Sequence, residues 1–237
     1  MGDNVIEVSN LYKIYRVGDE KVRALNGVNF SIEKGRFVAV IGTSGSGKST
    51  LLNMMAGLEK PTKGEIVIAG EHIETKNESQ LVNFRRKHVG FIFQSYNLLQ
   101  GMTAVENVSM PLVFQGVDKK TREKKAIDML KLVGLEKYMH HTPAQMSGGQ
   151  QQRVGIARAL VVKPEIIFAD EPTGNLDSKT SLDTLNLMQN VVRENNQTII
   201  MVTHDNYLAG FADERIRIKD GKIINIEYGR ENSAEQI

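Results

Sequence analysis

The sequence contains no cysteine and no tryptophan, and only 5 of its 237 residues are proline. A chain without cysteine has neither a disulfide framework nor thiol chemistry, which is typical of proteins of a reducing compartment. No apolar run approaches the ~18–20 residues that a membrane-spanning helix needs. The first ten residues, MGDNVIEVSN, lack the basic start and the apolar centre of a secretory signal. We therefore expect a soluble, cytoplasmic chain.

Charge of neither sign dominates the sequence. Thirty basic residues stand against 28 acidic ones, which gives a formal net charge of +2. A general nucleic-acid-binding surface requires a marked basic excess, so we expect no nucleic-acid partner. With 237 residues, of which 41% are hydrophobic, the chain can bury a sizeable core as one domain or as one domain with a subdomain.

Short runs rich in valine and isoleucine gather towards both ends of the chain. They span residues 4–8, 27–32, 36–41, 64–70, 165–170, 198–204 and 215–226. The runs FVAVI, IIFA and IIMV are apolar without alternation, which is typical of central strands covered on both faces. The KDGK turn inside the last run predicts a hairpin. The pattern favours an α/β fold with a parallel sheet covered by helices.

The middle of the chain shows helical spacing of its apolar residues and almost no strand signal. The clearest case is Ala126, Met129, Leu130 and Val133, which fall on one face of a helix. We expect a helical subdomain over about residues 95–162. It would be inserted into an α/β core of about residues 1–94 and 163–230, all within one domain.

The strongest local signal is VAVIGTSGSGKSTLLNMMAGL, in which an apolar strand leads through Gly42-x-x-x-x-Gly47-Lys48-Ser49 into an apolar helix. This is the context that a phosphate-binding loop requires. The glycines let the backbone curl so that its N–H groups point at one centre, towards which the helix also directs its positive end. Lys48 would contact the β- and γ-phosphates and the Ser49 hydroxyl would bind Mg²⁺. A purely structural glycine loop is the less favoured interpretation.

Two carboxylates, Asp170 and Glu171 in EIIFADEP, follow a buried strand. Charges at such a position are costly unless they have a partner, and ligands bind at the carboxyl ends of parallel strands. Beside a phosphate loop, Asp170 suits the coordination of Mg²⁺ and Glu171 suits a base that orients or deprotonates water. Taken alone, a solvated acidic turn is an equally good interpretation.

His204 in IIMVTHD and Gln94 in VGFIFQSYNLL also follow apolar strands. His204 could reach a γ-phosphate, and Gln94 could reach Mg²⁺ or the attacking water. A lone histidine is more often structural, and a lone glutamine is a weaker signal still, so both assignments depend on the other motifs.

A second helix start of the anion-binding kind lies in QMSGGQQQR, at residues 145–153. Ser147 is a natural N-cap, and the helix that follows has an apolar stripe. Its free N–H groups and its dipole would attract an anion. By itself an ordinary capped helix is favoured. Because the α/β core already supplies every role in one ATP site, this helix start has a purpose if it closes over nucleotide held by a second copy.

Taken in order, GTSGSGKST, Gln94, MSGGQ, IIFADEP, NLD and His204 closely resemble the motifs of ATP-binding-cassette (ABC) transporter ATPase subunits, across essentially the whole chain. The segments SGGQQQRVGIARAL and ADEPTGNLD look like the subgroup that serves lipoprotein release, macrolide export and antimicrobial-peptide resistance. Met146 stands where leucine is usual, which conserves volume. Asn175 stands in place of the commoner alanine or serine.

The resemblance implies an α/β fold: a P-loop NTPase core with a mixed, mainly parallel sheet, an N-terminal antiparallel β part and the inserted helical subdomain. It also implies a head-to-tail homodimer in which two ATP molecules lie between a phosphate loop and the facing signature motif. The ATP contacts would be Tyr15, Gly42, Ser44, Gly45, Ser46, Gly47, Lys48, Ser49 and Thr50, with Ser147, Gly148, Gly149, Gln150 and Asp177 from the partner protomer. The Mg²⁺ ligands would be Ser49, Gln94 and Asp170, and catalysis would use Glu171, His204, Gln94 and Lys48. Tyr15 would stack on adenine, although Tyr12 or Tyr15 could instead simply pack on the sheet.

The function that the resemblance implies is ATP hydrolysis coupled to export, extraction or resistance by a separate transmembrane permease. The permease would dock at an exposed apolar patch around Tyr96–Met102, of a few hundred Å². It would hold the chain at the inner face of the cell membrane. The alternative is a non-transport ATPase that regulates a membrane complex, of the cell-division type, which has the same motifs. A cassette acting on ribosomes or DNA would usually carry two cassettes or a long coiled-coil insertion, and neither fits in 237 residues.

Overall fold

The computed structural model describes residues 3–229, so residue 230, at which the predicted core ends, lies outside the described residues. Its centre is a six-stranded sheet with the strand order β10-β9-β3-β8-β7-β6. These strands are β3 (Phe37–Ile41), β6 (Val89–Ile92), β7 (Ile166–Asp170), β8 (Thr198–Thr203), β9 (Glu214–Lys219) and β10 (Lys222–Tyr228). All neighbours pair in parallel except β9 and β10, which form the hairpin that KDGK predicts. The carboxyl ends of β7 and β8 therefore meet beside the end of β3.

A second, antiparallel sheet lies at the N-terminal end of the chain and has the order β2-β1-β4-β5. Its strands are β1 (Asn4–Val17), β2 (Glu20–Glu33), β4 (Lys63–Ile68) and β5 (Glu71–His72). The strands predicted at residues 4–8 and 27–32 are only parts of β1 and β2, each of which has 14 residues. Register shifts let this long hairpin continue through polar residues that break the sequence pattern.

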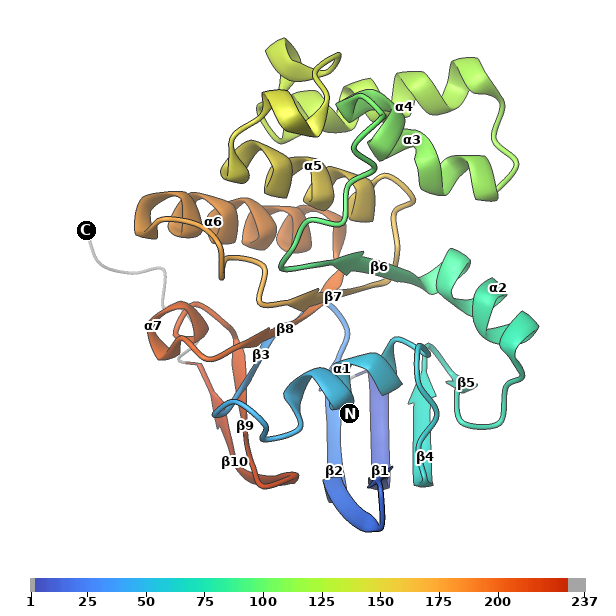
Figure 1. The fold of residues 1–237 in the computed structure, drawn as a ribbon, viewed down its shortest axis with the longest axis vertical. Coiled ribbons are helices and arrows are strands. Elements are labelled where there is room, and N and C mark those ends of the chain that lie inside the picture. Colours follow the sequence, from blue (N-terminus) through green and yellow to red (C-terminus); the bar gives the residue numbers. More distant parts are fainter. Residues whose placement is uncertain (1–2, 230–237) are drawn as a thin grey trace.

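Helices cover the central sheet and build a separate layer beyond it (Figure 1). They are α1 (Lys48–Met55), α2 (Glu78–His88), α3 (Ala104–Phe114), α4 (Lys119–Leu132), α5 (Gly148–Leu160), α6 (Ser178–Asn195) and α7 (Asn206–Ala209), with short 3₁₀ turns at Glu136–Tyr138 and Pro143–Gln145. In Figure 1 the layer of α3, α4 and α5 lies at the top and the antiparallel sheet at the bottom. Among residues 3–229, no helix combines the length and apolar content that crossing a bilayer requires.

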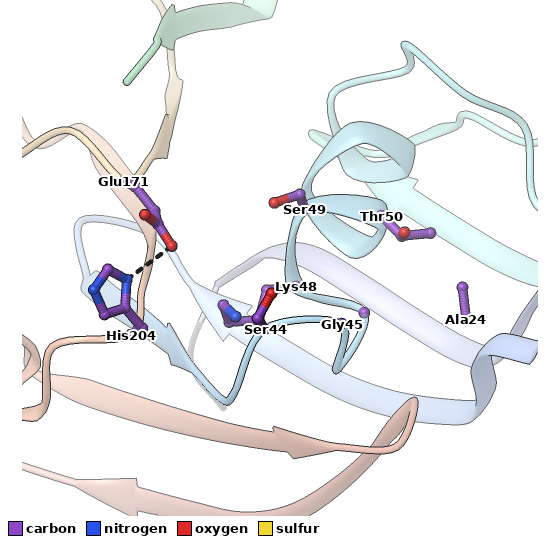
Figure 2. Close-up of a pocket in the computed structure, with 9 residues that line it drawn as sticks. Ala24, Ser44, Gly45, Lys48, Ser49, Thr50, Glu171 and His204 are labelled. Atoms are coloured by element: carbon purple, nitrogen blue, oxygen red, sulfur yellow. Dashed lines mark hydrogen bonds and ion pairs between the residues drawn. The ribbon is translucent and has the colours of Figure 1, made fainter. Parts of the chain in front are cut away.

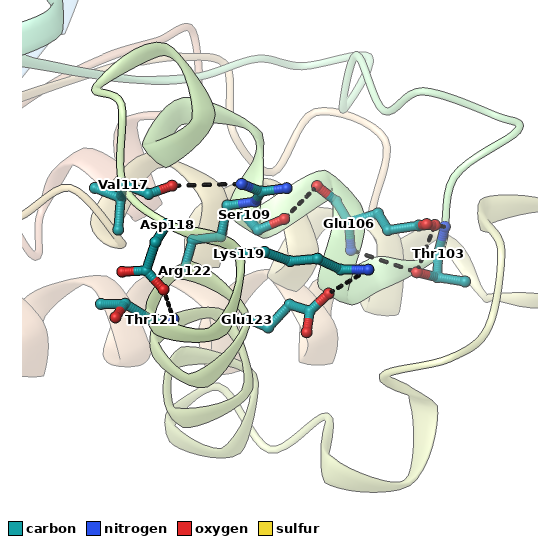
Figure 3. Close-up of polar contacts among 9 residues, drawn as sticks. All are labelled: Thr103, Glu106, Ser109, Val117, Asp118, Lys119, Thr121, Arg122 and Glu123. Carbon is teal, nitrogen blue, oxygen red and sulfur yellow. Dashed lines mark hydrogen bonds and ion pairs between the residues drawn. The ribbon is translucent and has the colours of Figure 1, made fainter.

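The helices of this upper layer begin at side-chain caps (Figure 3). At α3, the Thr103 hydroxyl accepts from the Glu106 N–H at 3.3 Å, and the Glu106 carboxylate accepts from the Thr103 N–H at 2.8 Å. At α4, Asp118 accepts from the Thr121 N–H at 3.0 Å. Each cap satisfies an N–H group that the helix itself leaves unpaired, so the sequence fixes where both helices start.

Three groups of buried apolar side chains hold the layers together. The first lies between the antiparallel sheet, α1 and one face of the central sheet, and the second covers the other face of the central sheet under α5, α6 and α7. The third joins α3, α4 and α5 to one another. Met129 and Leu187 pack against both the second and the third group. Burial on this scale is the main stabilising term for such a fold.

Candidate functional site

The glycine-rich loop connects β3 to α1 and leaves the start of that helix open. Within residues 3–229, no side chain caps the first turn of α1, whose N-cap is Gly47 at φ 103°. A Cβ at Gly47 would lie 2.4 Å from the carbonyl oxygen of Ala24, so only glycine fits there. The Lys48 ammonium folds back over the loop and donates to the Thr43 carbonyl at 2.9 Å. The open N–H groups and this ammonium make a site for an anion.

A cavity of about 540 Å³ opens in front of this loop (Figure 2). Its lining consists of Ala24, Ser44, Gly45, Gly47, Lys48, Ser49, Thr50, Glu171 and His204. The sequence analysis predicted six of these residues as ATP contacts and two more, Glu171 and His204, as catalytic residues. Glu171 and His204 lie across the cavity from the loop, as Figure 2 shows.

Asp170 ends β7 beside the start of α1. Its Oδ1 accepts a hydrogen bond from the Ser49 hydroxyl at 3.2 Å. Burial raises the pKa of Asp170, as does the neighbouring Glu171 charge, whereas the bond from Ser49 and the charge of Lys48 lower it. A hydroxyl and a carboxylate oxygen this close together are the hard oxygen donors that suit Mg²⁺.

Glu171 and His204 follow neighbouring parallel strands, β7 and β8, and contact each other. The Nδ1 atom of His204 lies 3.0 Å from Oε1 of Glu171. The Glu171 backbone adopts φ 43°, in the left-handed region, and its N–H donates to the Val202 carbonyl at 3.0 Å. The side chain of Glu171 is 23% exposed and that of His204 is 66% exposed. The carboxylate is thus held on the rim of the cavity, where a water molecule can reach it.

Gln94 follows β6 but lies outside the cavity lining. Its backbone carbonyl accepts from the Asn175 amide at 3.0 Å. Its own amide faces Gly174, where a Cβ would lie 2.8 Å from Gln94 Nε2. The segment that contains the unusual Asn175 therefore lies directly against Gln94.

The second helix start, at α5, is closed by its own chain. The Ser147 hydroxyl accepts from the Gln150 N–H at 3.3 Å, and the Gln150 side chain accepts from the Ser147 N–H at 2.9 Å. Ser147, Gly148, Gly149 and Gln150 line another cavity, of about 420 Å³, with Asn175 and Asp177. Within the described residues, this cavity and the one at the phosphate loop have no lining residue in common. One protomer therefore keeps the two motifs at separate sites.

Asp177 lies beside this second motif and caps α6. Its carboxylate accepts from the Thr180 N–H at 3.0 Å and from the Thr180 hydroxyl at 2.6 Å. Both bonds lower the pKa of Asp177, and the bond from the Thr180 hydroxyl has the larger effect. The two bonds therefore hold this carboxylate in one orientation at the edge of the cavity that residues 147–150 line.

Tyr15 lies on β1, outside the lining of the phosphate-loop cavity. Its hydroxyl donates to Glu59 Oε2 at 2.8 Å. Burial raises the pKa of Tyr15, as does Glu59, whereas Thr50 lowers it. Gly42, Ser46 and Asp170, also predicted for the site, are not among the residues that line this cavity. Sequence analysis missed Ala24, which enters the lining because a register shift places it as an extra residue between two β1–β2 pairs. No local pattern in the sequence reveals such a bulge.

Only part of the apolar segment expected to form a patch around Tyr96–Met102 is exposed. Leu99 is 47% exposed, but Leu98 is 7% exposed and belongs to the buried group of α3, α4 and α5. Tyr96 and Met102 are half-buried. The correction has a physical reason: Arg158 of α5 donates to the Tyr96 and Asn97 carbonyls and holds this segment against the helical layer.

Comparison with known proteins agrees with this geometry. The family model described as "ABC transporter" matches residues 25–174. An uncharacterized ABC transporter ATP-binding protein of Thermotoga maritima is 47% identical over 94% of this chain and 95% of its own length. The macrolide export ATP-binding/permease protein MacB of Hyphomonas neptunium is also 47% identical, over 98% of this chain, which spans only 36% of that protein.

A solved structure described as a dimeric post-hydrolysis state of the ATP-binding cassette MJ0796, bound to ADP and Pi, is similar throughout. It superposes with a TM-score of 0.89 at 42% identity and covers 95% of this chain and 99% of its own. The family match, the relatives and the shared fold together lead to one conclusion. This chain belongs to the ABC transporter family, of which it forms an ATPase domain.

Proposed function

We propose that this chain is the ATP-hydrolysing subunit of a membrane transporter, and that it works as a head-to-tail dimer coupled to a separate permease. The observation that carries the proposal is the phosphate-loop cavity, where an uncapped helix start and Lys48 face the Glu171–His204 pair. Donors for a phosphate chain and a carboxylate for water thus meet in one place. Phosphoryl transfer requires these two parts.

Nucleotide binding uses the loop and the groups around it. The N–H groups at the start of α1 and the Lys48 ammonium would bind the phosphates, and Ser44, Gly45 and Thr50 of the lining would contact them. Ser49 and Asp170 would hold Mg²⁺, because the hydroxyl and carboxylate oxygens lie 3.2 Å apart. When bound, the ion would neutralise charge on the β- and γ-phosphates.

Hydrolysis requires a water molecule aligned with the γ-phosphate. Glu171 would orient and deprotonate that water, since its carboxylate lies on the rim of the cavity and is held by His204 at 3.0 Å. His204 and Lys48 would stabilise the charge that develops on the γ-phosphate. We assign Gln94 to the same reaction, as a contact of Mg²⁺ or of the attacking water, from its position after β6.

The dimer explains the second motif. Ser147, Gly148, Gly149 and Gln150 line a cavity separate from the phosphate loop of their own chain, so we assign them, with Asp177, to ATP held by the partner. Support comes from the similar MJ0796 structure, which is described as a dimer with ADP and Pi. In a head-to-tail arrangement each phosphate loop would meet one signature motif.

The permease contact is assigned to the exposed Leu99 and the half-buried Met102 that follow Gln94. Macrolide-export relatives combine an ATP-binding part and a permease under one name, and this chain spans about a third of them. We propose that here the permease is a separate chain, which would hold this one at the inner face of the membrane. The cell-division alternative uses the same site residues and differs in its membrane partner.

Co-purification from membranes tests this assignment. Leu99→Glu should leave folding and the ATPase activity of the isolated chain intact, because the side chain is already exposed, but should abolish recruitment to the membrane. Leu98→Glu is the matched control: it buries a charge in the α3–α5 core and should unfold the chain. Recruitment that survives Leu99→Glu together with Met102→Glu would place the docking surface elsewhere. Identifying the membrane protein that co-purifies would distinguish a transport role of this chain from a regulatory role.

A further inference from the structure

The loop that leaves the C-terminal end of α1 is bonded to β1 next to Tyr15. The Thr62 N–H donates to the Tyr12 carbonyl at 2.9 Å, and the Ile14 N–H donates to the Thr62 hydroxyl at 3.0 Å. The other end of α1 begins at Lys48 in the phosphate loop. One short helix therefore connects the phosphate-binding loop to the strand that carries Tyr15.

Three side chains, those of Lys13, Tyr15 and Glu59, meet at this junction. Tyr15 Oη donates to Glu59 Oε2 at 2.8 Å, and Lys13 Nζ lies 2.9 Å from Glu59 Oε1. The same ammonium donates to the Lys60 carbonyl at 2.7 Å. The Lys13 and Glu59 side chains are 14% and 28% exposed, so solvent screens this pair less than it screens a fully exposed one. Both oxygens of Glu59 are occupied, one by the phenol and one by the ammonium.

Lys13 also covers one face of the Tyr15 ring. Its Nζ lies 5.1 Å from the ring centroid, within the ~6 Å range of a cation–π contact. The two residues are two positions apart on β1, so their side chains leave the same face of the sheet. The hydroxyl is fixed by Glu59 and one ring face is covered by Lys13. Lys13 covers only one of the two ring faces, so a flat ligand would stack on the other.

We propose that Lys13 and Glu59 are positioning residues, which together hold the Tyr15 ring for stacking on the base of the nucleotide bound at the phosphate loop. The inference rests on the proposed function, because it takes ATP as the ligand. Since the Tyr15 hydroxyl already donates to Glu59, it has no proton left to donate to the base, and we assign the contact with the base to the ring face. Every nucleobase has a face that can stack, so this arrangement strengthens the binding of ATP and GTP alike.

The test compares nucleotides with inorganic tripolyphosphate, which has the phosphates but no base. Glu59→Ala should raise the KM for ATP and for GTP by about three- to tenfold, part of the loss that removal of a stacked ring causes, and should change kcat by less than about twofold. Inhibition by tripolyphosphate should be unchanged. Lys13→Met keeps a side chain of similar length without the charge, and it should shift KM in the same direction.

A double-mutant cycle separates positioning from general support of the fold. In a Tyr15→Ala background, Glu59→Ala should add less than about twofold to KM, because the residue acts through the missing ring. Glu65→Ala changes an exposed glutamate on the neighbouring strand β4 and is the matched control, with an expected KM equal to that of the unaltered chain. Thermal unfolding of each variant shows whether it is folded. If Glu59→Ala is unfolded, Lys13→Met takes its place in the test.

Two results would overturn the proposal. One is a loss of tripolyphosphate binding in Glu59→Ala as large as the loss of ATP binding, and the other is the same KM shift with and without Tyr15. Failure of the proposed function looks different: the unaltered chain would not hydrolyse ATP, or Lys48→Ala would retain full activity. An active chain that loses activity in Lys48→Ala but keeps its KM in Glu59→Ala would reject only the roles of Lys13 and Glu59.

Discussion

The starts of α1 and α5 are both glycine-rich helix N-termini, yet they differ in how their free N–H groups are used. In the described chain, α1 has Gly47 at its N-cap and no side-chain cap, so its first N–H groups face an open cavity. At α5, Ser147 and Gln150 form reciprocal bonds, of which one occupies the Gln150 N–H of the first turn. The first is ready for an anion, whereas the second is partly capped by its own chain.

This difference indicates how the two motifs divide their tasks. An open helix start keeps its donors in place for a ligand, so binding there requires little rearrangement. A capped start has an internal acceptor at one donor, and the 3.3 Å bond from the Gln150 N–H to Ser147 is long enough to be exchanged for an anion. The phosphate loop therefore suits the first contact with nucleotide, and the signature helix suits a contact made later by a second protomer.

The largest expected effect comes from stopping turnover while both helix starts remain intact. Glu171→Gln should retain ATP binding but slow hydrolysis by at least ~10²-fold, the scale of losing a general base. The ATP-bound dimer should then accumulate, because hydrolysis no longer opens it. Size-exclusion chromatography with ATP and Na⁺ measures its population. A variant that stays monomeric at high protein concentration would contradict the sandwich arrangement.

The next largest effect should show which protomer's nucleotide site each of the two helix starts serves. Ser147→Arg should leave ATP affinity of the monomer nearly unchanged and should lower steady-state ATPase activity by about 10²-fold, as expected when electrostatic stabilisation of the phosphate is lost. Lys48→Ala should instead weaken binding by its own monomer. Equilibrium nucleotide binding and phosphate release measure the two quantities.

Mixing these two variants gives the sharpest form of the comparison. A heterodimer of Ser147→Arg with Lys48→Ala holds one site with an intact loop and an intact signature, so activity should reappear only in the mixture. Loss of monomeric nucleotide binding in Ser147→Arg would assign the signature to its own chain's site and remove the proposed division of tasks.

The smallest effect concerns the caps themselves. Ser147→Ala and Thr103→Ala each remove the N-cap hydroxyl of a capping box, at α5 and at α3 respectively. Each should lower the free energy of unfolding by about 1 kcal/mol, the usual value for an N-cap. Only Ser147→Ala should also lower ATPase activity. Chemical denaturation and steady-state ATPase assays of both variants test this, and equal activities would mean that the Ser147 hydroxyl is purely structural.

Much of the fold followed from local patterns in the sequence. FVAVI, IIFA and IIMV predicted buried parallel strands, and all three lie in the central sheet as β3, β7 and β8. The KDGK hairpin is also confirmed. The cavity brings together residues that were predicted at strand ends far apart in sequence, because parallel strands end at one edge of the sheet.

Contacts between distant segments could not be predicted in this way. The bulge at Ala24 depends on how β1 pairs with β2, and the bonds of Glu59 depend on where the loop after α1 meets β1. The same limit applies to Leu98, whose burial depends on the packing of α3, α4 and α5 rather than on its neighbours in sequence. Gln94 was assigned to the reaction from its position after β6, but the groups next to it come from the distant residues 174 and 175.

The left-handed backbone of Glu171 has a consequence for engineering. A non-glycine residue with φ 43° occupies a region that is unfavourable for most side chains by about 1–2 kcal/mol. Asparagine tolerates that conformation better than glutamate does, and glycine tolerates it best. A library selected for heat resistance alone would therefore be drawn towards these residues at position 171, and the more robust members it returned would have lost their carboxylate. Any selection among variants of this ATPase should therefore also measure their ATP turnover.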